Sequence, residues 1–158
     1  MKHTIRALAA LFLLAALCLL SACGAKPAEP VDLQKLYGDI ADTVELPDML
    51  ALSEKRIESY YGIDPAACPQ LLIYIAEDGL RVDELWLIEA ADEEAAKQLE
   101  ALAVSHCEQV CAETENYLPE QYAAAKDARI LREGKTVALF LSPEAPAMEK
   151  RFLAAFGK

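Results

Sequence analysis

The sequence predicts a single α+β domain with leading helices and two hairpin-plus-helix units (ββαββα). These units would form a four-stranded, mainly antiparallel sheet with helices packed on one face. The first supporting observation is that the order of strand-like run, strand-like run and helical stretch occurs twice along the chain. The second is that a glycine-containing turn separates the two runs of each pair. The third is the length of 158 residues, which suits one domain with a buried core.

The leading helices are predicted from apolar spacing and from helix signals. Residues 31–44 carry apolar side chains three and four positions apart, as one face of a helix requires. Leu46-Pro47 interrupts this pattern. Ser53 can then cap a shorter helix that ends at Gly62.

The first hairpin-plus-helix unit begins with a strand at 71–76, "LLIYIA". Asp78-Gly79 supplies a hairpin-type turn, and 82–90, "VDELWLIEA", is the returning strand. The middle of this second strand is apolar on both faces, so we expect it to be central or covered. Asp92 is placed to cap a long helix that runs to about Glu115.

The second unit follows a short helical turn that begins at Pro119. Strands are expected at 128–132 and 136–141 around Glu133-Gly134, and a last helix at about 145–156. Similar apolar residues also recur at corresponding positions of the two units, with a constant offset. This similarity indicates either an internal duplication or two units with the same burial pattern.

The N-terminal segment 1–22 is predicted to be a signal peptide. Lys2 and Arg6 precede the uncharged stretch 7–20, which is shorter than the roughly 20 residues that a membrane-spanning helix needs. An ordinary secretory signal or an uncleaved anchor is the alternative.

The end of this segment, Leu20-Ser21-Ala22-Cys23, resembles the lipobox of bacterial lipoproteins. The resemblance implies that Leu20, Ser21 and Ala22 are recognised by a signal peptidase. It also implies that the Cys23 thiol carries a diacylglyceryl group. Two acyl chains are enough for stable anchoring, so we expect the membrane to be a partner and the protein to lie on its extracytoplasmic face.

Residues 23–30 are expected to be the lipidated cysteine and a tether, and 31–158 the single folded domain. The tether "GAKPAEP" is small, polar and proline-containing. Seven residues reach at most roughly 25 Å, so the domain would stay close to the bilayer.

The charge balance argues against nucleic acid as a partner. The chain has 26 acidic and 15 basic residues, and a surface this acidic repels phosphate groups. No acidic stretch has the spacing of a calcium-binding loop.

Three cysteines follow Cys23. Cys107 and Cys111 lie four positions apart on a predicted helix, which is too far for a disulfide between them. Cys68 could pair with one of the two. Together with His106 these thiols would make an incomplete zinc site, so buried thiols, no metal site and no cofactor are expected.

No catalytic residues are assigned from the sequence. Beyond the signal peptide the chain has a single histidine, His106, in the middle of a predicted helix and on its apolar side. There is no Gly-x-Ser-x-Gly elbow and no phosphate-binding glycine loop. Carboxylate pairs such as Asp83-Glu84 are expected at the acidic surface.

Two stretches rich in tyrosine are weak candidates for a binding surface, because aromatic and polar side chains together suit recognition. The alternative is that these tyrosines pack at helix ends. Trp86 is expected in the core. The candidates are Tyr60, Tyr61 and Asp64 in "ESYYGID", and Tyr117, Glu120, Gln121 and Tyr122 in "NYLPEQY".

Several stretches together resemble a family of short Gram-positive-type bacterial lipoproteins that is catalogued as domain of unknown function 4358. Besides the lipobox, they are "YYGID" at 60–64, "DELWLIEAAD" at 83–92, "YLPEQY" at 117–122 and "EGKTVALFLSPEA" at 133–145. The resemblance implies an extracytoplasmic lipoprotein with a compact α+β domain. It implies no activity, and Cys23 is the one functional residue that it assigns.

The sequence therefore favours a non-enzymatic binding or interaction module at the cell envelope, with an unidentified protein or small molecule as its partner. One alternative is an envelope hydrolase that uses acidic residues, for which a cleft should hold two carboxylates roughly 5–9 Å apart. Another is an accessory subunit of an uptake or sensory complex, which should expose a large apolar patch.

Overall fold

The computed structural model describes residues 30–158. The predicted signal peptide, the lipobox with Leu20, Ser21, Ala22 and Cys23, and all of the tether except Pro30 lie outside these residues. No helix in the described part is both long and apolar enough to cross a membrane.

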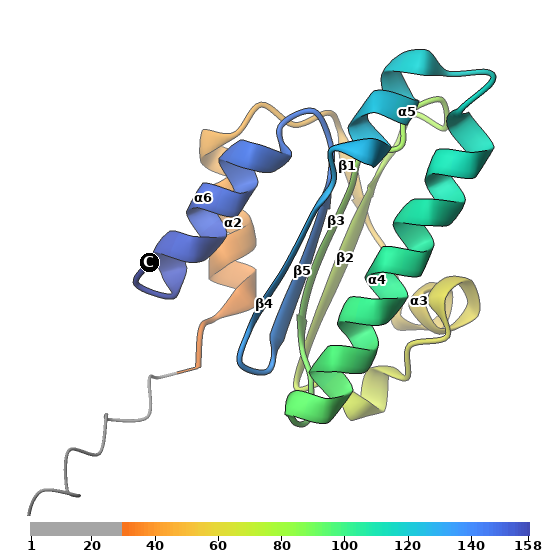
Figure 1. Cartoon of the computed structure of the whole chain (residues 1–158). Coiled ribbons are helices and arrows are strands. Elements are labelled where there is room, and N and C mark those ends of the chain that lie inside the picture. Colours follow the sequence, from red (N-terminus) through yellow and green to blue (C-terminus); the bar gives the residue numbers. More distant parts are fainter. Residues whose placement is uncertain (1–29) are drawn as a thin grey trace, which may run out of the picture. The chain divides into compact units, whose positions relative to one another are not determined.

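The domain is built on a five-stranded antiparallel sheet with the order β1-β2-β3-β5-β4 (Figure 1). The hairpins β2–β3 and β4–β5 are joined by pairing of β3 with β5, in which Glu84 lies opposite Leu141. The strands are β1 (Met49–Ala51), β2 (Gln70–Ala76), β3 (Glu84–Glu89), β4 (Arg129–Glu133) and β5 (Thr136–Leu141).

The four predicted strands are confirmed, but the count of four is wrong. β1 adds a fifth strand at the edge, where Met49 lies opposite Ala76 of β2. With three residues, β1 is too short to show an alternating pattern, so the sequence gives no signal for it.

Helices cover both faces of the sheet, so the prediction of helices on one face is wrong (Figure 1). α2 and α6 pack on one face, and α3, α4 and α5 on the other. The physical reason is that β3 and β5 are buried on both faces, which requires a helical layer on each side. The helices are α2 (Leu33–Thr43), α3 (Glu54–Tyr61), α4 (Glu93–Thr114), α5 (Pro119–Lys126) and α6 (Ala145–Ala155).

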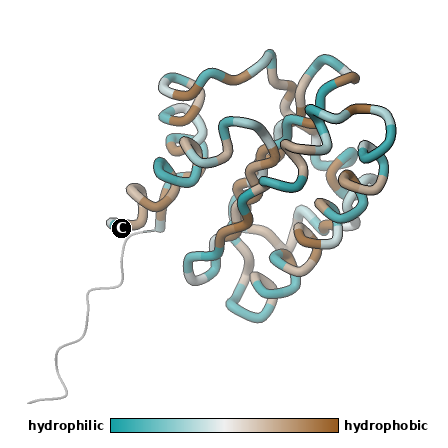
Figure 2. The backbone as a smooth tube through the Cα atoms, turned by 45° about the horizontal axis from the view of Figure 1, so that its top comes forward, coloured by the Kyte–Doolittle hydropathy of each residue, from teal (hydrophilic) through white to brown (hydrophobic). Residues whose placement is uncertain are grey.

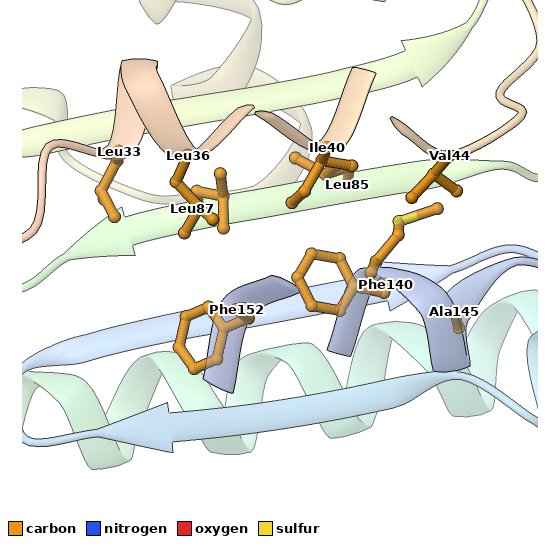
Figure 3. Packing of buried hydrophobic residues seen from close by; sticks show 11 residues of the cluster. Leu33, Leu36, Ile40, Val44, Leu85, Leu87, Phe140, Ala145 and Phe152 are labelled. Atoms are coloured by element: carbon orange, nitrogen blue, oxygen red, sulfur yellow. The ribbon is translucent and has the colours of Figure 1, made fainter. Parts of the chain in front are cut away.

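The first core lies between the sheet and the helices α2 and α6 (Figure 3). Leu85 and Leu87 of β3 and Phe140 of β5 point into it and are fully buried. Phe152 of α6 meets Phe140 edge-on, with ring centroids 6.2 Å apart. Aliphatic residues of α2 close the layer; they are Leu33, Leu36 and Ile40.

The second core lies between the other face of the sheet and the helices α3, α4 and α5. Trp86 of β3 is fully buried there, as predicted, together with Leu139 and Leu141 of β5. Figure 2 shows hydrophobic residues concentrated along the strands, between helices whose colours alternate. This alternation is the pattern of amphipathic helices that cover a sheet.

Most of the predicted helix-capping and turn residues have these roles in the structure. The side chain of Asp92 accepts a hydrogen bond from the Ala95 backbone N–H at the start of α4. Gly62 ends α3 with φ of 68°, and Gly134 turns the β4–β5 hairpin with φ of 58°. Both angles lie in the left-handed region that favours glycine. Ser53 precedes α3 as predicted, but its side chain makes no capping hydrogen bond.

The two hairpin-plus-helix units do not repeat each other in space. Ile88 and Leu141, which correspond in the two units, face the same core. The helices that follow them, α4 and α6, pack on opposite faces of the sheet. The strands of the two units therefore share a burial pattern, whereas the helices that follow them do not share a face of the sheet.

The chain enters the domain through a contact with the side chain of Gln70. Its amide Nε2 donates to the Val31 carbonyl and to Glu89 Oε2, at 2.9 and 2.8 Å. Its Oε1 accepts from the Leu33 backbone N–H at 2.8 Å. Gln70 lies opposite Glu89, the last residue of β3, so the chain entry is fixed at that end of the sheet.

Candidate functional site

Two buried carboxylates stand side by side in the sequence where β3 begins. Asp83 is 2% exposed and Glu84 is 7% exposed, so the prediction that this pair lies at the surface is wrong. Because successive residues of an extended strand point to opposite faces, each carboxylate serves a different side of the sheet. Their position directly before an apolar strand is the one sequence signal for their burial.

Glu84 lies at the centre of an aromatic cluster on the α3–α4 side. Its Oε2 lies 2.8 Å from Nε2 of His106 on α4, and its Oε1 accepts a hydrogen bond from Nε1 of Trp86. The His106 ring stacks on Trp86, with centroids 5.4 Å apart. Tyr61 of α3 meets both rings edge-on, at 4.8 Å from Trp86 and 5.2 Å from His106.

This cluster is arranged to hold three elements together. Burial and the neighbouring Glu84 carboxylate raise the pKa of Tyr61 above its ordinary value, so its hydroxyl stays protonated. Both oxygens of Glu84 are bonded, and the His106 Nε2 is occupied by Glu84. His106 lies at the edge of the core as predicted, whereas its carboxylate partner was not predicted.

Asp83 connects the start of β3 to the end of β5 through a side-chain hydrogen bond on the α2–α6 side of the sheet. Its Oδ1 accepts a 2.8 Å hydrogen bond from the Ser142 hydroxyl, and its Oδ2 accepts a 2.9 Å bond from Nε of Arg81. The Ser142 oxygen in turn accepts from the Glu144 backbone N–H at 3.2 Å. Through this chain of bonds Asp83 orders the turn that leads into α6.

Two cavities flank the Ser142-Pro143 turn. The first, of about 270 Å³, also has Arg81, Asp83 and Glu144 in its wall, with residues 45–47 opposite. The second, of about 480 Å³, has lining residues from α5, β4 and α6, which are Glu120, Ala123, Ala124, Asp127, Arg129 and Pro146. The wall of the first cavity is mainly polar and carries three carboxylates and one arginine. The wall of the second cavity is mainly apolar and carries two carboxylates and one arginine.

The candidates in "ESYYGID" do not form a common site. Tyr60 is 62% exposed, whereas Tyr61 is turned into the aromatic cluster. The Asp64 carboxylate accepts from the Ala66 backbone N–H and starts the short 3₁₀ turn Pro65–Ala67. The tyrosine packing that the sequence left as the alternative therefore describes Tyr61.

The candidates in "NYLPEQY" are dispersed around α5. In Figure 1, α5 and α3 lie beside different parts of the long helix α4. Tyr117 is 83% exposed, and Tyr122 lies under Nζ of Lys126 at 5.3 Å from the ring centroid. Oε1 of Gln121 accepts a 3.0 Å hydrogen bond from the Val82 backbone N–H. Gln121 thus contacts the segment that leads into β3, and Glu120 lines the second cavity.

The three cysteines of the described residues are free, so the disulfide considered for Cys68 is not formed. Burial raises the pKa of the Cys107 thiol to about 12, with Glu84 and Cys111 adding to the shift. Burial and Asp64 raise the pKa of Cys68. Within residues 30–158 no three metal-ligating side chains are grouped.

The stretches that carry the family resemblance meet around the start of β3. Asp83 and Glu84 come from "DELWLIEAAD", and Ser142, Gln121 and Tyr61 from three other stretches. A family model described as "Domain of unknown function (DUF4358)" matches residues 42–142. The chain belongs to this family.

The DUF4358 match contains both partners of the Asp83–Ser142 bond and every member of the Glu84 cluster. It leaves out nearly all of α2 and the whole of α6, the two helices that cover one face of the sheet. Searches found no matching curated protein and no matching solved structure.

Proposed function

We propose that this DUF4358 protein is a membrane-anchored, extracytoplasmic lipoprotein whose domain is a non-enzymatic binding module. The anchor would be a diacylglyceryl group on Cys23. Its ligand would engage the end of the sheet where β3 begins, beside the Ser142-Pro143 turn. The sequence Leu20–Cys23 supports the anchor, and the position of the two cavities supports the binding end.

The observation that carries this proposal is the distance between the chain entry and the cavities. Val31 is held by Gln70 next to Glu89, the last residue of β3, while Asp83 precedes its first residue. Six residue steps along the strand separate Asp83 from Glu89 by about 20 Å. A short tether would keep the entry end near the bilayer, so the cavities would be presented away from it.

The bonding of the buried carboxylates favours binding over acid–base chemistry. Asp83 and Glu84 point to opposite faces, so they do not form the facing pair that glycoside hydrolysis uses. Each of their four oxygens has a hydrogen-bond partner. Within the described residues no buried side-chain nitrogen or oxygen lacks a partner.

The anchor is tested by the intact mass of protein purified from membranes. We expect a chain that begins at Cys23 and carries a diacylglyceryl group, and a Cys23→Ser variant that keeps residues 1–22. An unmodified wild-type N-terminus would contradict the anchor.

The binding end is tested by site-specific photo-cross-linking in the native membrane. A photoreactive residue at Glu144 lies in the first cavity, and one at Lys97 lies on the exposed surface of α4 as a matched control. We expect a recurrent adduct from position 144 that is absent from position 97. Equal capture at both positions would contradict the proposed binding end. If neither position gives a protein adduct, a melting screen with small molecules follows, in which a ligand should stabilise wild type more than Arg81→Ala.

A further inference from the structure

A groove of about 420 Å³ lies between α4, α5 and the edge strand β4, apart from the cavities described above. Its wall is mainly apolar and carries two thiols. The exposed residues Glu108 and Lys126 contribute its charged groups. The lining residues are Val104, Cys107, Glu108, Cys111, Ala125, Lys126, Ala128 and Ile130.

The two thiols are one helical turn apart on α4. At this spacing their Cβ atoms are roughly 5–6 Å apart, whereas a disulfide needs roughly 3.5–4.5 Å. Both thiols are free, in agreement with this limit. Two metal–sulfur bonds of about 2.3 Å span about 4.6 Å between the sulfur atoms. Two side chains at a Cβ spacing that excludes a disulfide can therefore present their sulfurs to one shared cation.

We propose that Cys107 and Cys111 form a two-coordinate site for a soft, thiophilic monovalent cation, with Cu(I) as the physiological candidate. Binding would replace two S–H bonds by two S–Cu bonds and release two protons, with no change in oxidation state. Thiolate ligands select Cu(I), whereas zinc requires a tetrahedral set of four ligands.

The surroundings of the thiols favour this coordination over a zinc site. His106 is adjacent to Cys107, but its Nε2 is directed to Glu84, and His106 is not among the residues that line the groove. The other lining residues are aliphatic except for the exposed Glu108 and Lys126, and within residues 30–158 no third metal-ligating side chain is grouped with the two thiols. Cys107 is buried and Cys111 is half-buried, which leaves one thiol accessible for entry of the ion.

The test is a Cu(I) titration of the full chain under anaerobic conditions, against a colorimetric Cu(I) chelator. The variants are Cys107→Ala, Cys111→Ser and, as the matched control, Cys68→Ser. Cys68 is a partly buried free thiol in a different cavity. Because other cysteines of the chain are common to all variants, the readout is the difference in bound Cu(I) per chain.

We expect wild type and Cys68→Ser to retain one more equivalent of Cu(I) than either groove variant. We also expect Cu(I) to raise the melting temperature of these two proteins alone. Melting curves without metal establish that each variant is folded, and the half-buried Cys111 allows a mild substitution if Cys107→Ala is unstable. The proposal is overturned if Cys111→Ser binds as much Cu(I) as wild type, or if Zn²⁺ competes for the site at equal concentration.

Discussion

The Ser142 hydroxyl donates a 2.8 Å hydrogen bond to Oδ1 of Asp83, across 59 positions of sequence. It joins the start of β3 to the end of β5 beneath the two cavities. A single pair of side chains therefore fixes the turn on which the proposed binding end is built.

Ser142→Ala is expected to lower the free energy of unfolding by about 1–3 kcal/mol, because one oxygen of a buried carboxylate loses its donor. The measurement is urea denaturation followed by Trp86 fluorescence. Ser105→Ala, on the exposed surface of α4, is the matched control and should change stability by no more than about 0.5 kcal/mol. Equal effects of the two substitutions would refute a special role of the Asp83 bond.

The aromatic cluster predicts coupling between Glu84 and His106. His106→Phe keeps a ring against Trp86 but leaves Glu84 without one of its two partners. We expect each of His106→Phe and Glu84→Gln to cost about 1–3 kcal/mol of stability. The stability cost of the double variant should be smaller than the sum of the two single-variant costs by about 0.5 kcal/mol or more. Strict additivity in circular-dichroism denaturation would show that the two side chains act independently.

Two glycines should respond to alanine with opposite signs. Gly62 ends α3 with φ of 68°, so Gly62→Ala forces a side chain into the left-handed region and should cost about 1–2 kcal/mol. Gly38 lies inside α2, and a Cβ there meets no atom within 4 Å. Gly38→Ala should therefore stabilise by about 0.5–1 kcal/mol. Thermal melting of the pair checks both signs, and destabilisation by Gly38→Ala would contradict this account.

Stability should fall as the solution becomes alkaline. The pKa of Cys107 is raised to about 12 in the folded chain, so the unfolded chain releases this proton first, from about pH 9. Unfolding is then favoured by up to about 1.4 kcal/mol per pH unit between these two values. The raised pKa of Tyr61 adds a second loss above about pH 10.

The measurement is urea denaturation in reductant across pH 8 to 11, for wild type, Cys107→Ala and Tyr61→Phe. Each variant should show a shallower decline than wild type, because it lacks one of the groups whose proton release is linked to unfolding. A Cys107→Ala profile parallel to that of wild type would count against the assignment to Cys107.

Gln70 should control how firmly the chain entry is held. Gln70→Ala removes the bonds to Val31, Leu33 and Glu89. We expect hydrogen exchange at the Leu33 amide to accelerate by at least tenfold while amides of β3 and β5 stay protected. Gln98→Ala, on the exposed face of α4, is the control and should leave the Leu33 exchange rate unchanged. Fast exchange at Leu33 in wild type would contradict the proposed contact.

Helices and strands could be predicted from the sequence where the apolar periodicity agrees with the capping and turn residues at its ends. Asp92 and Gly62 mark helix ends correctly, and the apolar middle of β3 indicated a central strand. β1 was missed because a three-residue strand has no period of its own. The second helical layer was missed because the sequence of a strand that is buried on both faces does not indicate which helices cover each face.

The candidate site was less predictable because its contacts join residues that are distant in sequence. Asp83 and Glu84 are two carboxylates among many, and their position at the start of an apolar strand is the one local feature that distinguishes them from surface residues. Their burial depends on partners such as Ser142 and His106, which the pairing of β3 with β5 and the packing of α4 bring near. Tyrosine composition drew attention to Tyr60 and Tyr117, which are the exposed members of their stretches.

The strand order has a consequence for biosynthesis. β5 lies beside β3 in the middle of the sheet but is the last strand to be made. Until Leu141 has emerged, β3 has an unpaired edge, and the core beneath α2 lacks Phe140 and Phe152. Folding must therefore await almost the whole chain, and a nascent protein would expose apolar strands to chaperones and proteases until then.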